Sequence, residues 1–133
     1  MEGLEPKEAY DRAIVETCSY YHQSTFSDEL THFSRIFSGT IGHLPQEEVK
    51  SSGNVIHTLE ASLWCFLTTR SYEEAVLAAV NLGEDTDTTG IVTGGLAGVH
   101  YGLEQVPVRW RDQLARREEM ATLFGSFQRV VCA

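Results

Sequence analysis

The sequence predicts one all-α domain spanning residues 1–133. Apolar residues recur every three or four positions in several separate segments, which is the period of one face of an α-helix. Capping residues and glycines mark the ends of these segments, and no segment alternates apolar and polar residues as a half-buried strand does. The chain is 42% hydrophobic and 22% charged, with only three prolines, which is typical of one globular core without a linker.

Two helices are predicted in the first third of the chain. The first begins at Pro6, a favourable first helical residue, and keeps one apolar face as far as Tyr21. The second is short and has Ser27 as its predicted N-cap. Its apolar side consists of Leu30, Phe33, Ile36 and Phe37. The glycines at 39 and 42 end it, and a loop follows through Pro45.

Two buried helices are predicted next. The first runs from Val55 to about Thr69, because its apolar residues form a wide stripe at helical spacing. The second begins after Ser71, which has the spacing of a capping box with Glu74: each side chain then satisfies a backbone N–H group. Gly83 ends this helix, since glycine adopts the left-handed conformation without a Cβ clash.

A row of glycines marks the segment between Asp85 and the break at Pro107. The row comprises Gly90, Gly94, Gly98 and Gly102, with Thr93, Ala97 and Tyr101 in a second row of the same spacing. A glycine inside a helix costs about 1 kcal/mol relative to alanine, so the row needs a compensating reason. Close approach of a neighbouring helix supplies one, because two backbones can pack nearer without Cβ atoms. We therefore predict a tightly packed central helix, and the polar residues at its start argue against a membrane helix with this spacing.

The last part of the chain predicts a short amphipathic turn around Trp110 and Leu114, followed by a final helix. This helix is predicted to start after the charged residues at 116–119. Its apolar side consists of Met120, Leu123, Phe124, Phe127 and Val131.

Charge and cysteine usage exclude several classes of protein. Lys and Arg number 10 against 19 Asp and Glu, a net charge of −9 that repels a nucleic-acid backbone. Cys18, Cys65 and Cys132 lie far apart without a paired spacing, which favours neither a disulfide framework nor a zinc site. No apolar run approaches the roughly 20 residues that cross a bilayer, and the polar N-terminus does not resemble a signal peptide. We expect a cytoplasmic protein that binds neither nucleic acid nor membrane.

The densest polar cluster of the chain lies at 84–89, at the start of the glycine-rich helix. Asp85 and Asp87 are separated by one residue and followed by Thr88, which offers hard oxygen ligands of the kind that Mg²⁺, Mn²⁺ and Ca²⁺ prefer. The spacing is not that of an EF-hand. Alternatively, Asp85 or Asp87 only caps the helix, where its charge also meets the positive end of the helix dipole.

The region from residue 50 to 115 resembles the C-terminal half of the ADP-ribosylglycohydrolase family. The resemblance rests on Ser51–Leu67, Ser71–Val76, Ala79–Thr88 and Gly94–Gly102, and on Pro107 with Trp110. It implies an orthogonal multi-helix bundle, the C-terminal portion of the family's all-α fold. It also implies a hydrolase with two Mg²⁺ or Mn²⁺ ions in a central cleft, which removes ADP-ribose from modified protein side chains or cleaves related ADP-ribose linkages.

The resemblance also assigns roles to individual residues. Asp85, Asp87 and Thr88 match the metal ligands of the family's Asp-x-Asp-Thr motif, and Ser52 and Gly53 match the loop beside ADP-ribose. At the next position Asn54 replaces the family's usual aromatic residue, which removes a stacking surface from the substrate-binding segment 52–54.

His57 stands where the family usually has an acid. It is a candidate general base, but a single histidine on a helix more often serves as a polar partner in packing. The other histidines have no spacing that favours metal binding.

Full-length members of this family are longer, and their N-terminal half carries further metal motifs and the residue thought to activate water. None of those motifs occurs in these 133 residues. Taken as complete, the chain is expected to hold one half of a dinuclear site and to be inactive without an N-terminal half or a second chain. A non-catalytic helical binding or scaffold protein derived from the family is the alternative, and a helical domain whose Asp-Thr cluster is only a cap is the third possibility.

Overall fold

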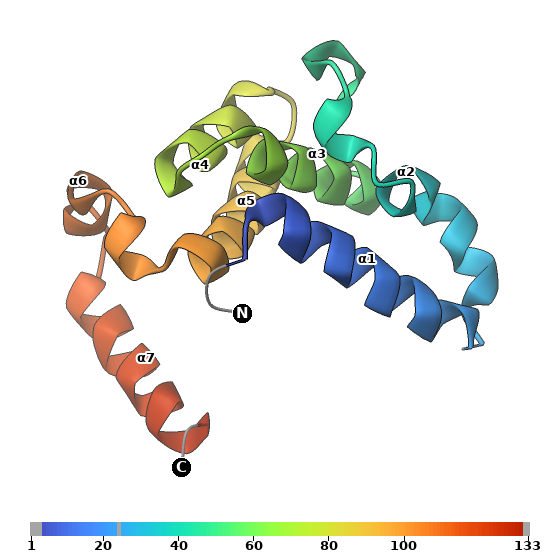
Figure 1. Ribbon diagram of the computed structural model, residues 1–133. Helices are drawn as coiled ribbons and strands as arrows, with labels where there is room; N and C mark the ends of the chain where they lie inside the picture. Colours follow the sequence, from blue (N-terminus) through green and yellow to red (C-terminus); the bar gives the residue numbers. More distant parts are fainter. Residues whose placement is uncertain (1–3, 24, 132–133) are drawn as a thin grey trace.

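The computed structural model describes residues 4–23 and 25–131, and these residues form helices and no strand (Figure 1). Seven α-helices are described: α1 (Pro6–His22), α2 (Ser34–Phe37), α3 (Val55–Thr68), α4 (Tyr72–Asn81), α5 (Thr86–Tyr101), α6 (Val108–Asp112) and α7 (Arg117–Val131). Short 3₁₀ helices connect them: η1 (Ser27–Phe33), η2 (Ile41–His43), η3 (Gln46–Glu48) and η4 (Leu103–Gln105). The predicted all-α class is confirmed, while Cys132 lies outside the described residues.

Helix α3 lies at the centre of the fold and separates two small cores (Figure 1). On one side, α1 and α2 cover it through a cluster built on Tyr10, Ile36 and Ile41. The Tyr10 hydroxyl donates a hydrogen bond of 2.5 Å to the carbonyl of Ile36, so the polar tip of this buried side chain is satisfied. On the other side, α4 and α5 pack around Phe66, Ala75 and Ala97.

The predicted close approach of the glycine row to a neighbouring helix is confirmed for α5 against α4. A Cβ built on Gly90 would lie 3.2 Å from Val80 Cγ1, and one on Gly94 would lie 3.3 Å from the Tyr72 hydroxyl. Gly102 is different, because α5 ends at Tyr101 and Gly102 follows it with a φ of 79°. Its role is therefore to end the helix, not to admit a neighbour.

Some predicted boundaries and caps were wrong. Ser27 is the first residue of η1 and not an N-cap, and a 3₁₀ segment takes up most of the predicted short helix. α7 begins at Arg117, within the charged run, because Glu118 and Glu119 are favourable in the first turn of a helix. No helix of the described chain is long and apolar enough to cross a membrane.

The capping box before α4 is confirmed on one side only. The Ser71 hydroxyl accepts a hydrogen bond of 3.1 Å from the Glu74 N–H group, as predicted. The Glu74 carboxylate reaches one residue further back and accepts the N–H group of Arg70 at 2.9 Å. Gly83 has a φ of 88° and ends α4 as predicted.

Candidate metal and ligand site

The acidic cluster lies in the turn between α4 and α5. Gly83 and Glu84 both have positive φ angles, 88° and 53°, and this pair of left-handed residues turns the chain from one helix into the next. Asp85 then caps α5, with its Oδ1 atom accepting the N–H group of Thr88 at 3.4 Å. Of the two predicted caps, the structure thus uses Asp85.

The two aspartates of the cluster interact with each other. The side chains of Thr88 and Asp87 lower the pKa of Asp85, and the Thr88 N–H group acts in the same direction. Asp87 lies in the first turn of α5 and is exposed, as is Thr88, whereas Asp85 is half-buried. Asp85, Asp87 and Thr88 therefore stand together at the solvent-accessible start of one helix, in the positive field of its N-terminus.

The segment 51–54 lies directly against this turn. The Asp85 N–H group donates to the Ser51 carbonyl at 3.0 Å, and the buried Ser51 hydroxyl donates to the Gly83 carbonyl at 3.0 Å. A Cβ built on Gly53 would lie 3.1 Å from Asp85 Oδ2, closer than a side chain tolerates without movement. The structure thus brings the predicted ligand residue Gly53 beside the predicted metal residue Asp85.

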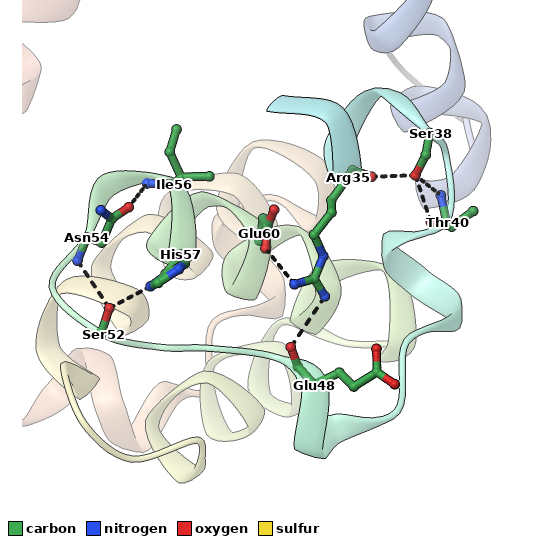
Figure 2. Close-up of polar contacts among 9 residues, drawn as sticks. All are labelled: Arg35, Ser38, Thr40, Glu48, Ser52, Asn54, Ile56, His57 and Glu60. Atoms are coloured by element: carbon green, nitrogen blue, oxygen red, sulfur yellow. Dashed lines mark hydrogen bonds and ion pairs between the residues drawn. The ribbon is translucent and has the colours of Figure 1, made fainter. Parts of the chain in front are cut away.

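The side chains of Ser52 and Asn54 turn toward α3 (Figure 2). Ser52 Oγ lies 2.7 Å from Nδ1 of His57, so this histidine has the polar partner that the sequence favoured. Asn54 caps α3, with its Oδ1 atom accepting the N–H group of Ile56 at 2.9 Å. Asparagine is among the best N-cap residues and aromatic residues are not, which gives the departure at position 54 a structural reason.

An ion pair anchors the chain that leads into segment 51–54 (Figure 2). The Arg35 guanidinium lies 3.5 Å from the carboxylate of Glu60, which is 6% exposed, and donates to the Glu48 carbonyl at 3.3 Å. These contacts tie α2 and η3 to α3. Sequence reasoning missed them, because the partners lie 13 and 25 residues apart and no spacing rule connects such residues.

The donor set at the start of α5 fits one hard divalent cation. Mg²⁺ is commonly held through one or two carboxylates and keeps several waters, and Asp85 and Asp87 with the Thr88 hydroxyl offer this kind of oxygen set. Within residues 4–23 and 25–131, no group of three or more His, Cys, Asp or Glu side chains is placed to share an ion. A second ion would therefore need donors from outside the described residues.

Two buried hydroxyls lie further along α5. Thr89 and Thr93 are fully buried, and their Oγ1 atoms have no hydrogen-bond partner among the described residues. Ser62 on α3 donates instead to the Thr89 carbonyl at 3.4 Å. The carboxylates therefore stand above a closely packed seam between α3 and α5, which holds the start of α5 in place.

The chain is similar to known proteins over most of its length. The profile of the ADP-ribosylglycohydrolase family matches residues 1–131. The ADP-ribosylarginine hydrolase Tri1 of Serratia proteamaculans is 39% identical over 66% of this chain and 24% of its own length. The ADP-ribosylhydrolase ARH3 of Bos taurus is 33% identical over 64% of the chain and 27% of its own length. The ADP-ribosyl-[dinitrogen reductase] glycohydrolase of Rhodospirillum rubrum is 30% identical over 70% of this chain and 30% of its own length.

The chain spans about a quarter of the length of the first of these relatives. The family profile matches almost the whole chain. The chain belongs to the ADP-ribosylglycohydrolase family.

Proposed function

We propose that this chain is the C-terminal part of a metal-dependent hydrolase that removes ADP-ribose from modified protein side chains or cleaves related ADP-ribose linkages. The observation that carries the proposal is the contact of Gly53 with Asp85, which joins the two segments assigned to ligand and metal. The names of the relatives support the substrate class, since each acts on an ADP-ribosylated target. Arginine is the acceptor in the name of one relative.

Each residue of the site has a distinct task in this proposal. Asp85, Asp87 and Thr88 would hold Mg²⁺ or Mn²⁺ through oxygen atoms, and a bound ion would supply stabilisation of charge at the glycosidic bond. Gly53, without a side chain, lets ADP-ribose pass close to the backbone. Ser52 and Asn54 flank Gly53 in the same segment, and their side chains, which turn toward α3, hold its backbone beside the ligand.

The complete site requires donors that the described residues do not supply. We propose that an N-terminal half or a second chain contributes the remaining carboxylates and the base that activates water. The cytosol is the proposed location, because the cysteine pattern favours a reducing compartment.

Metal binding tests the proposal directly. Calorimetric titration of the chain with Mn²⁺, with and without ADP-ribose, is expected to show binding that Asp87→Asn abolishes. Asp28→Asn, which removes an exposed carboxylate on η1, is the matched control and is expected to bind as the wild type does. Absence of heat at millimolar Mn²⁺ would contradict a metal site in this chain alone.

Activity provides a second test. The chain by itself is expected to release no ADP-ribose from ADP-ribosylated protein, measured by chromatography of the free nucleotide. Turnover by the chain alone, abolished by Asp87→Asn, would show that the catalytic base lies within these residues and would overturn that part of the proposal.

A non-catalytic helical binding or scaffold protein is the second candidate. The limited donor set favours it, since within the described residues no third His, Cys, Asp or Glu side chain joins the two carboxylates. ADP-ribose binding that persists without metal and in Asp87→Asn would favour this candidate over the hydrolase.

A further inference from the structure

The contact between Ser52 and His57 is the shortest side-chain hydrogen bond of the candidate site, and the proposed chemistry does not use it. Ser52 Oγ and His57 Nδ1 are 2.7 Å apart, and both residues are half-buried or exposed at the edge of the site (Figure 2). The Asn54 N–H group donates to the same Oγ atom at 3.4 Å. The serine hydroxyl is therefore shared between the imidazole and the backbone of its own loop.

One arrangement of the protons satisfies both contacts. Ser52 Oγ accepts the Asn54 N–H group and donates its own proton to the Nδ1 atom of His57. A neutral imidazole with its proton on Nε2 provides that acceptor. Thr58 also holds this loop against α3, since its hydroxyl lies 3.2 Å from the Asn54 carbonyl and 3.5 Å from the Ser52 carbonyl.

The loop is held from the opposite side by the acidic turn. A Cβ on Gly53 would lie only 3.1 Å from Asp85 Oδ2, and the Ser51 carbonyl accepts the Asp85 N–H group. The backbone at Gly53 is thus clamped between His57 on α3 and Asp85 before α5. A movement of Ser52 changes the position of Gly53, because adjacent residues share a rigid peptide plane.

We propose that His57 is a positioning residue for the ligand segment. By accepting the Ser52 hydroxyl proton it holds residues 52–54 in the conformation that presents Gly53 beside Asp85. The inference rests on the proposed function only for the identity of the ligand. His57 acts through Ser52 and touches no reacting atom, and its Nδ1 atom, already occupied, does not serve as a base.

Three substitutions separate this role from simple packing. In His57→Asn, the amide Oδ1 atom is two bonds from Cβ, as Nδ1 is in histidine. The acceptor for the Ser52 hydroxyl is therefore retained. In His57→Gln the amide oxygen lies one bond further out, and in His57→Ala no acceptor remains. Ser52→Ala removes the donor, and combining it with His57→Ala tests whether the two residues act as one unit.

The first readout is amide hydrogen exchange of the ligand-free chain by NMR. Exchange at Asn54 is expected to be faster in His57→Ala and His57→Gln, and close to the wild-type rate in His57→Asn. The imidazole ¹⁵N shifts of the wild type are expected to show an unprotonated, hydrogen-bonded Nδ1 that changes in Ser52→Ala.

The second readout is calorimetric affinity for ADP-ribose with Mn²⁺ present. His57→Ala is expected to weaken binding about tenfold, the loss of one hydrogen bond, and His57→Asn to restore it. The double variant with Ser52→Ala is expected to bind no more weakly than either single variant. Affinity for Mn²⁺ alone is expected to stay unchanged in all of them.

The two readouts distinguish this inference from the proposed function. If the wild type does not bind ADP-ribose, the ligand assignment fails, and Asn54 exchange still decides whether His57 holds the loop. Asn54 exchange that is unchanged in His57→Ala, or is not restored in His57→Asn, overturns the positioning role. Additive losses of ADP-ribose affinity in the double variant would also overturn it.

Discussion

The burial of helices α5 and α7 is the opposite of what their amphipathicity predicts. Of the five long helices, α7 has the most pronounced apolar face and α5 the least. Yet no residue of α7 is buried, while Thr89, Thr93 and Ala97 of α5 are completely buried. In Figure 1, α7 extends away from the other helices, and α5 lies among them.

The difference shows that burial depends on the partner and not on the apolar stripe itself. Glycines at 90 and 94 let α4 approach α5, and alanine and threonine on its other side lie against α3. Small side chains give a weak hydrophobic contrast around the helix but permit close packing. On α7 the large side chains of Leu123, Phe124 and Phe127 are each at least 60% exposed, because no described element lies over them.

The sharpest test of this comparison truncates one phenylalanine in each region. Phe66→Ala is expected to lower the free energy of unfolding by about 3–5 kcal/mol, because Phe66 is 3% exposed in the α3–α5 core. Phe127→Ala on α7, where the ring is 66% exposed, is expected to change it by less than about 0.5 kcal/mol. Urea unfolding followed by circular dichroism measures both. Equal losses would show that α7 is covered in solution.

A second test enlarges adjacent glycines on α5. Gly94→Leu is expected to cost about 1–3 kcal/mol, because the added side chain meets the Tyr72 hydroxyl and Val76 on α4. Gly95→Leu is the matched control, since a Cβ on Gly95 meets nothing within 4 Å. Urea denaturation compares the pair, and a Gly94→Leu variant as stable as Gly95→Leu would contradict the close approach of the two helices.

A third test concerns the buried tyrosine between α1 and α2. Tyr10→Phe is expected to cost about 1–2 kcal/mol at pH 8, because the Ile36 carbonyl loses its donor. Burial, with the charges of Asp11 and Glu60, raises the pKa of Tyr10 to about 12 from 10. The raised pKa contributes stability that is present below pH 10 and is lost as the pH rises toward 12.

The difference in stability between the wild type and Tyr10→Phe is therefore expected to shrink from pH 8 to pH 11. Chemical denaturation at both values measures it, and the variant controls for the other groups that titrate in this range. A constant difference would contradict a buried, hydrogen-bonded hydroxyl.

The smallest expected effect is at the α3–α5 seam. Thr93→Val keeps the shape of a fully buried side chain and removes a hydroxyl that has no partner among the described residues. The substitution is expected to stabilise the fold by up to about 1 kcal/mol in thermal unfolding. A destabilised Thr93→Val variant would indicate a hydrogen bond at this position.

Much of the helical architecture could be predicted from local patterns. Periodicity located α1 and α3, the Ser71 cap located α4, and Gly83 located the turn before the acidic cluster. These features depend on residues within one or two helical turns, so a short window of sequence contains their physical cause. Two predicted boundaries were wrong. Ser27 begins a 3₁₀ helix where an N-cap was expected, and α7 begins at Arg117, inside the charged run that was expected to precede it.

The candidate site was only partly predictable. Asp85, Asp87 and Thr88 stood out as neighbouring oxygen donors, and the family resemblance pointed to residues 52–54. The contacts that join the two segments could not be predicted, because Gly53 and Asp85 lie far apart in the sequence. Asn54 stands immediately before the predicted helix start at Val55, an N-cap signal that the sequence analysis missed. No spacing rule connects Arg35 with Glu60.

The sequence by itself thus determined which segments are helical, where several of them begin and end, and which carboxylates stand at a helix N-terminus. Hydrogen bonds and steric preferences between near neighbours are sufficient to decide those features. Only the tertiary structure decided that α5 is buried and α7 exposed, and that His57 holds Ser52 while Gly53 meets Asp85. Those outcomes depend on which surfaces come together. Packing stabilises contacts between segments that are far apart in the sequence, so a short window of sequence does not contain their cause.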